Sequence, residues 1–387
     1  GISRNDVDVL TDLGPFFNAT YDFLKGAGVI PSFVNPANFS RDNHYAQETE
    51  TLSAFFQGTY SLTDDVRLIA GIRYTHETKD FNRQGKFSEF QDYDTPAGLD
   101  ASVTAALNGL VVPVAVFDGS RTEKHFTPSV KIQWDVNDDM MGYALVEKGF
   151  KGGGFNNNID TTLESAEFEE EEALSFEAGV KSTIADGSGE LNMSIFRTEY
   201  DDLQVSTWNG ISFDVGNAAK SISQGVEFDG RFALTDNLIV GGAVAYLDST
   251  YDSFKTAGCP VGVTAPCDLS GRPTPLSPEW SGNLFAEYNM RLDNGMEFRA
   301  GIDLNYLDDM FLDTDLDENL TQDAYTKING RLTLIGKDNR WEVTLIGKNL
   351  TDKTTLGTGY DQPLVAGGYV AFVEAPREIS VRLKVNF

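Results

Sequence analysis

The stretch PREISVRLKVNF (376–387) decides the fold class, because apolar and polar side chains alternate along it without a break. One face carries the apolar set Ile379, Val381, Leu383, Val385 and Phe387. A period of two indicates a β-strand whose two faces meet different surroundings. An edge strand of a soluble sheet is one interpretation. A transmembrane β-barrel is favoured, because its strands are apolar outside, polar inside and aromatic at the membrane interfaces.

The composition is that of a folded protein with an acidic surplus. Of the 387 residues, 41% are hydrophobic and 23% are charged, which is ordinary for a folded chain. The net charge of −29 repels phosphates, so nucleic acid is excluded as a partner. A solvated acidic surface is favoured over a dedicated cation site. No run of about 18 apolar residues occurs, so no membrane helix is predicted.

Alternating segments recur through residues 47–387, and the gaps between them are short and long in turn. The short gaps read SLTDD (61–65), NDD (137–139), ADGSG (185–189), TDN (235–237), DNG (293–295) and KDNR (337–340). Their residue types suit tight hairpin turns. The longer gaps are 80–121, 150–169, 207–218, 253–277, 310–322 and 351–375. Such segregation is typical of an outer-membrane barrel, whose short turns face the periplasm.

Two segments show the two faces of the predicted wall. In 296–306, one face carries Met296, Phe298, Ala300, Ile302, Leu304 and Tyr306. The other face carries Glu297, Arg299, Asp303 and Asn305. Residues 280–292 repeat the pattern, with Phe285 as an exception. Charges of both signs on one face fit a wet lumen or a lumen filled by a polar plug.

The hairpins amount to about thirteen antiparallel strands. Single-chain bacterial barrels have an even number of strands, and an unpaired edge in lipid leaves backbone groups unsatisfied. The prediction is therefore an all-β fold, the C-terminal part of a larger transmembrane barrel over residues 47–387. Residues 1–46 are predicted to be an outer loop region. A strand hidden in 1–46 would instead give fourteen strands, enough for a complete barrel.

Cys259 and Cys267 are the two cysteines, and they flank the segment PVGVTAP. They make a poor zinc site, because no other Cys and no His stands nearby. A disulfide that closes this loop is favoured over free thiols. It implies an oxidising compartment.

Several motifs resemble the TonB-dependent outer-membrane receptor family. They are GFKGGGFN (149–156), EEALSFEAGVKS (171–182), NAAKSISQGVEFDG (217–230), SPEW (277–280) and GKNLTDK (347–353), followed by the terminal Phe387. The resemblance covers roughly residues 47–387, and the ordered set is more specific than any single motif.

The resemblance implies a 22-strand barrel around an N-terminal plug, preceded by a motif that engages TonB. Neither plug nor motif is found in this sequence, so the chain would correspond to the last strands of the barrel. The implied setting is the outer membrane of a Gram-negative bacterium, with the lipid bilayer and lipopolysaccharide around a monomeric barrel. The implied partners are the TonB complex, a ligand such as a ferric siderophore and, in some systems, a surface lipoprotein. No cofactor is predicted.

Candidate ligand contacts lie in or beside the predicted outer loops. Phe155, Asn156, Trp208 and Phe311 are the candidates for substrate binding, because exposed aromatic side chains can stack on a ligand. Girdle or loop-packing roles compete with this interpretation. Ligand contacts in the plug or in strands outside this chain are an equally open alternative.

Asp313, Asp315 and Asp317 stand at alternate positions in DDMFLDTDLDEN and form a weak Ca²⁺ candidate. An EF-hand loop would need Gly at its sixth position and Glu at its twelfth, where this chain has Glu318 and Ala324. A solvated acidic loop is favoured. The three histidines are scattered along the sequence and no haem-receptor loop motif is found, so no metal site is predicted.

The favoured function is active uptake of a scarce solute, such as an iron–siderophore complex, across an outer membrane. A passive porin-like channel and a secreted β-rich adhesion or binding protein are the alternatives. No catalytic motif is found, so the chain is not predicted to be an enzyme.

Overall fold

The computed structural model describes most of the chain. The described residues are 2–12, 39–89, 97–98, 116–157, 166–208, 213–260, 262–264, 266–362 and 367–386. The fold is all-β, and within these ranges the one helical element is a 3₁₀ turn at Lys337–Asn339. Among the described residues, no helix has the length and apolarity needed to cross a membrane.

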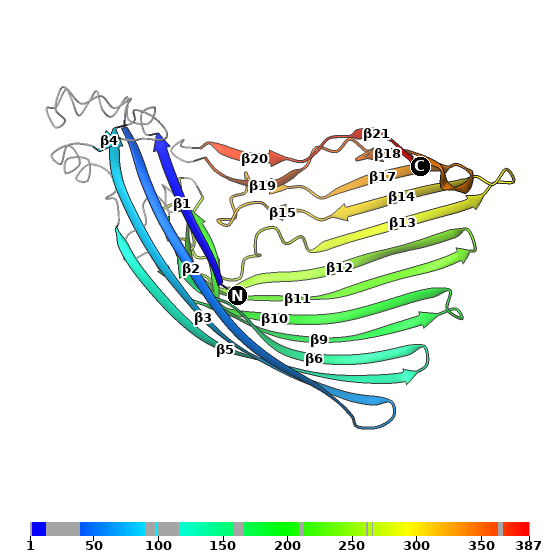
Figure 1. Ribbon diagram of the computed structural model, residues 1–387, viewed down its shortest axis with the longest axis horizontal. Coiled ribbons are helices and arrows are strands. Elements are labelled where there is room, and N and C mark those ends of the chain that lie inside the picture. Colours follow the sequence, from blue (N-terminus) through cyan, green and yellow to red (C-terminus); the bar gives the residue numbers. More distant parts are fainter. Residues whose placement is uncertain are drawn as a thin grey trace.

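The described residues form twenty-one strands, and Figure 1 labels most of them. The long strands are β1 (Ile2–Asp12), β2 (Phe39–Ser61), β3 (Val66–Glu89), β5 (Phe117–Asn137), β6 (Met140–Lys151), β9 (Glu171–Ile184), β10 (Gly189–Trp208), β11 (Phe213–Thr235), β12 (Leu238–Ser253), β13 (Trp280–Arg291), β14 (Glu297–Leu307), β17 (Tyr325–Ile335), β18 (Trp341–Lys348) and β21 (Glu378–Val385). The short strands are β4 (Ala97–Gly98), β7 (Gly154–Phe155), β8 (Glu167–Phe168), β15 (Met310–Phe311), β16 (Thr321–Gln322), β19 (Leu356–Asp361) and β20 (Tyr369–Val373).

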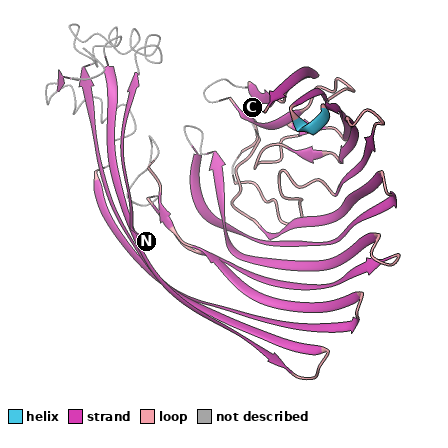
Figure 2. Cartoon of the chain, turned by 45° about the vertical axis from the view of Figure 1, so that its right-hand side comes forward, coloured by secondary structure: helices cyan, strands magenta, loops and turns pink. Residues whose placement is uncertain are grey.

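The long strands form one antiparallel sheet, and each pairs with the next long strand in the sequence. This order is that of an up-and-down barrel wall. β1 and β21 are the two edges, and in the part of the chain that the structure describes they do not pair with each other. Figure 2 shows the resulting shape as an open trough.

The first residues differ from the predicted outer loop. β1 pairs with β2 in a continuous register from Ile2–Glu50 to Asp12–Ser40. A strand is therefore present within 1–46, and β2 begins at Phe39, eight residues before the predicted start of the barrel. The sequence ISRNDVDVLTD gives only a weak apolar face, which is why its strand was missed. The rest of the predicted loop, 13–38, lies outside the described residues.

The six predicted tight turns are confirmed, since each joins two consecutive paired strands. The turn after β9 uses Ala185, Asp186 and Gly187, all with φ between 52° and 86°. Glycine is unstrained in this left-handed region and Asp is tolerated there.

The strands at the loop end are longer than predicted. β3 and β5 extend into the predicted gap 80–121, and β10 and β11 leave only 209–212 between them. A barrel strand needs about 10 residues to cross the membrane, whereas β3 has 24. The extensions of β3 and β5 are mostly polar, apart from residues such as Phe81 and Phe117, and they continue the hydrogen-bond ladder, so a regular apolar pattern does not reveal them.

The two faces of the sheet have the predicted characters. The outward face carries exposed apolar side chains on nearly every strand, including Phe56, Ile72, Phe126, Phe176, Ile195, Phe228, Val244, Leu284, Ile302, Leu332, Leu345 and Val381. The inward face carries cross-strand ion pairs such as Arg67–Asp135, with a 2.7 Å contact, and Arg331–Glu287. An apolar outside and a charged inside are the faces of a transmembrane barrel.

Aromatic side chains mark the limits of the apolar face. Trp280 packs on Tyr246 with ring centroids 5.0 Å apart at the loop end of β13, and Tyr288 lies on the same face nearer the tight turn. Eight residue steps at about 3.3 Å separate Trp280 from Tyr288 along the strand, or about 26 Å. An outer apolar band is about 25 Å tall and flanked by aromatic girdles, and its strands tilt by about 35–45°. At that tilt, the distance from Trp280 to Tyr288 spans about 20 Å of the band.

Candidate functional site

The segment that follows β6 turns back over the inner face of β3 and β5. Lys79 Nζ donates to the Gly153 carbonyl oxygen at 2.6 Å, and the Gly153 N–H donates to Glu123 Oε1 at 3.0 Å. A Cβ at Gly153 would lie 2.5 Å from the Phe168 carbonyl oxygen and 2.6 Å from Arg121 Cζ. Glycine is required because the backbone at 153 lies against both the returning strand β8 and the Arg121 side chain of the wall. The GGG of GFKGGGFN is thus explained by a close approach to the wall.

Two amides hold the other end of this inner segment. Asn217 Nδ2 donates to the carbonyl oxygens of Glu169 and Asp202 at 2.8 and 2.9 Å. Gln204 Nε2 donates to those of Gly152 and Glu169, both at 3.0 Å. The segment between β6 and β9 is therefore tied to β10 and β11 as well as to β3 and β5.

Phe155 and Asn156, two of the predicted ligand contacts, are used in packing. Phe155 stacks on Phe81 with ring centroids 5.1 Å apart, against a buried cluster that includes Phe117. Asn156 is buried, and its side-chain amide bonds both backbone groups of Val215, accepting at 3.0 Å and donating at 2.8 Å. Both side chains therefore fix the inner segment to the wall, with Asn156 buried and Phe155 partly buried.

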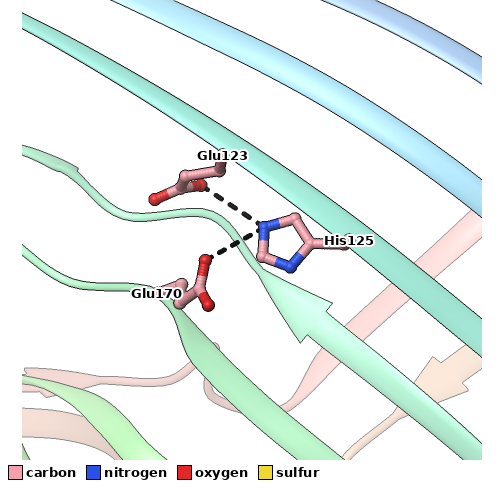
Figure 3. Close-up of side chains that lie close together, drawn as sticks. All are labelled: Glu123, His125 and Glu170. Atoms are coloured by element: carbon pink, nitrogen blue, oxygen red, sulfur yellow. Dashed lines mark ion pairs between the residues drawn. The ribbon is translucent and has the colours of Figure 1, made fainter.

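Glu123, His125 and Glu170 meet beneath this segment (Figure 3). His125 Nε2 lies 3.1 Å from Glu170 Oε2 and 3.6 Å from Glu123 Oε2. The imidazole ring stacks on Phe150, with centroids 3.6 Å apart and planes at 16°. Glu123 and His125 share one face of β5 because they are two residues apart, whereas Glu170 comes from the segment before β9.

This trio is the group that sequence reasoning missed. The available signal was the Glu-x-His spacing in TEKHF (122–126), which places both side chains on one strand face. The run FEEEEA (168–173) read as solvated rim, and nothing local indicates that Glu170 turns inward. Burial raises the pKa of Glu170; the charge of His125 lowers it, and that of Glu123 raises it.

A second carboxylate group lies in the outer loop after β15. Asp313, Asp315 and Asp361 bring carboxylate oxygens within 4.8 Å of one another, and all three are buried. The predicted third member, Asp317, instead accepts from the Asn319 N–H at 2.7 Å. Burial, followed by the charge of Asp313, raises the pKa of Asp315 to about 7. Carboxylate oxygens suit Ca²⁺, but hydrogen bonds within the loop also account for this arrangement.

The remaining predicted residues lie at the loop end of the sheet. Phe311 packs, partly buried, against the cluster around Phe254, with Arg272 Cζ 5.7 Å from its ring centroid. Trp208 ends β10, and its side chain lies outside the described residues. Cys259 and Cys267 form a disulfide with Cα atoms 5.4 Å apart. It closes a turn of the loop between β12 and β13.

A family model described as "TonB dependent receptor-like, beta-barrel" matches residues 3–350. Among curated proteins, the metal-pseudopaline receptor CntO of Pseudomonas aeruginosa is 21% identical over 357 residues, which cover 90% of this chain and 42% of that protein. The pesticin receptor of Yersinia pestis is 24% identical over 206 residues, or 53% of this chain and 27% of that protein. The chain thus spans less than half the length of these relatives.

Among solved structures, the ferric yersiniabactin uptake receptor FyuA from Yersinia pestis superposes with a TM-score of 0.70 and 18% identity. The match covers 90% of this chain and 47% of that one. At these identities the structural likeness shows the fold alone. The relatives are transport receptors and not enzymes.

Proposed function

Because this chain belongs to the TonB-dependent receptor-like β-barrel family, we propose that it forms part of the wall of an outer-membrane receptor that imports a metal–chelator complex. Receptors of this family lie in the outer membrane of Gram-negative bacteria, and they bind TonB and siderophore or metal-complex ligands. The finer assignment to this chain rests on its own two-faced sheet and on the named ligands of its relatives.

The proposal is supported by two asymmetries of the sheet, one between its two faces and one between its two ends. Across the sheet, the outward face is apolar and the inward face carries ion pairs. Along it, six tight turns lie at one end and the long connections at the other (Figure 1). A receptor needs both, because the barrel must sit in lipid while its loops face the medium.

Closure of the barrel is part of the proposal. β1 and β21 are unpaired with each other among the described strands, and such edges are costly in lipid. In the proposed receptor, further strands complete the wall and a plug fills the charged lumen. Energy delivered through TonB would rearrange the plug and open the path.

The proposed solute is a metal held by an organic chelator. Support comes from CntO, named as a metal-pseudopaline receptor, and from FyuA, named as a ferric yersiniabactin uptake receptor. The loops at the outer end would capture it. Trp208 and Phe311 remain proposed contacts, whereas Phe155 and Asn156 would act by holding the inner segment in place.

The test is uptake by cells that express the complete receptor and lack their own chelate receptors. Cells with and without a functional tonB gene are offered a panel of ⁵⁵Fe-labelled siderophores and of nickel- and zinc-loaded metallophores. The expected result is accumulation of at least one complex that stops when TonB is absent or the membrane potential is dissipated. A cell fractionation in parallel should recover the receptor only with detergent.

Two results would contradict the proposal. Uptake that continues undiminished without TonB indicates a passive porin-like channel. Release of the protein without detergent indicates a secreted binding protein.

A further inference from the structure

We propose that Glu123, His125 and Glu170 bind one divalent transition-metal ion on the inner wall of the barrel, such as Zn²⁺. The ion would join β5 to the segment before β9. This site is separate from capture of a chelated metal by the outer loops, so it goes beyond the proposed function.

The distances fit coordination of one ion. Two ligand atoms on a tetrahedral zinc, each about 2.0–2.1 Å from the metal, are about 3.3 Å apart. The two contacts of His125 Nε2, 3.1 Å to Glu170 and 3.6 Å to Glu123, lie on either side of that value (Figure 3). All three ligand atoms lie within 4.8 Å of one another.

Two of the three converging atoms are buried and unsatisfied. Within the described part of the chain, Glu123 Oε2 and His125 Nε2 have no hydrogen-bond partner. Their residues are only 7% and 6% exposed. Buried polar atoms are normally paired, and exceptions call for an explanation such as an ion. A metal ion would satisfy both atoms at once.

The other atoms of these side chains are already held. Glu123 Oε1 accepts from the Gly153 N–H at 3.0 Å and from Arg121 Nε. The imidazole is clamped by its stack on Phe150. Supporting contacts of this kind orient the ligands of metal sites. Glu123 and His125 are therefore fixed with their open atoms close to each other and to Glu170.

The local charge also favours a cation. Two cations, Lys79 and Arg121, face five carboxylates. The carboxylates are Glu77, Glu123, Glu167, Glu169 and Glu170. While His125 is neutral, this set has three more negative than positive charges. A divalent ion would offset most of that excess.

The donor set selects the class of ion. Imidazole nitrogen suits zinc, copper, iron and nickel, whereas calcium and magnesium prefer all-oxygen sites. Three protein ligands leave a fourth tetrahedral position open, which water or a donor atom of a passing solute can fill. The competing explanation is a protonated His125 held between two carboxylates.

The experiment measures Zn²⁺ binding to the complete receptor, purified in detergent, stripped with a chelator and free of any histidine tag. Isothermal titration gives stoichiometry and affinity. Visible absorption of bound Co²⁺ reports whether nitrogen and oxygen donors surround the ion. His125→Gln and Glu170→Gln are the test variants. His76→Gln is the matched control, since His76 is in the neighbouring strand and pairs with Lys124 on the opposite face.

The expected result is one Zn²⁺ per receptor, with affinity at least tenfold weaker in His125→Gln and in Glu170→Gln and unchanged in His76→Gln. Heat-modifiable migration on a gel shows that each variant barrel is folded. Absence of stoichiometric binding to the wild-type receptor would overturn the proposal and support the protonated-histidine explanation. Unchanged affinity in both folded test variants would overturn it too. Neither readout depends on chelate uptake, so failure of this site and failure of the proposed function are distinguishable.

Discussion

Leu284 offers the sharpest test of where the lipid lies. Its side chain is 63% exposed on the outward face of β13, four residues from both Trp280 and Tyr288. At about 3.3 Å per residue, each aromatic limit is about 13 Å away along the strand, so Leu284 lies near the midplane. Leu284→Arg should destabilise the folded receptor by about 2–4 kcal/mol, the cost of an Arg on the lipid face at that depth.

The matched control is Asn283→Arg, which adds the same charge one residue away on the inward face. Asn283 pairs with Asn305 and Ala243 in the polar lumen, so this change should be nearly silent. The assay is denaturant unfolding of the complete receptor in phospholipid vesicles, followed by tryptophan fluorescence. The predicted penalty corresponds to about a 30- to 700-fold shift in the folding equilibrium. Equal destabilisation by the two variants would refute the assignment of faces.

Three further predictions concern the loops. Gly153→Val should detach the inner segment from β3 and β5, because no Cβ fits at this position. Limited proteolysis should then cut the variant within 150–170. A segment that stays intact would contradict the close approach of the Gly153 backbone to its neighbours. In the folded protein the pKa of Asp315 is raised from 3.8 to about 7. The protonated carboxyl therefore stabilises the fold fully below pH 4, and this stabilisation is lost as the pH rises through 7. The loss is at most about 4 kcal/mol. The protection factors of amides 312–320, which are corrected for the intrinsic base-catalysed rate of exchange, should therefore fall from pH 5 to pH 8. Asp315→Asn should remove that fall, and an equal fall in the variant would count against the prediction. Cys259 and Cys267 should resist a maleimide in denatured, unreduced protein and react after reduction, whereas labelling before reduction would contradict the disulfide.

The sequence was sufficient to predict the wall because its determinants are local. Alternation of apolar and polar residues identifies each strand, and Asp, Asn and Gly identify each turn. Both signals identify the six hairpins between 47 and 350. They fail in β1 and in the outer parts of β3 and β5, where apolar residues are few and do not alternate regularly along the strand.

The candidate site was less predictable because it depends on contacts between distant segments. Glu170 reaches His125 only because the segment after β6 folds inward, guided by Gly153 and Asn217. Asp361 joins Asp313 across 48 residues of sequence. An inward-turning loop and an exposed one have similar composition, so the sequence alone does not show that Phe155 and Asn156 pack against the wall.

The most direct test of the central claim, that this sheet is a barrel wall with lipid outside and water inside, is a spin-label scan of β13. Single cysteines at 281–288, labelled with a nitroxide in the complete receptor in vesicles, are probed with oxygen, which concentrates in lipid, and with a water-soluble nickel complex. The account predicts that accessibility to oxygen peaks at the even positions and accessibility to nickel at the odd positions, a period of two with opposite phases. Two probes that rise and fall together along the strand would contradict it.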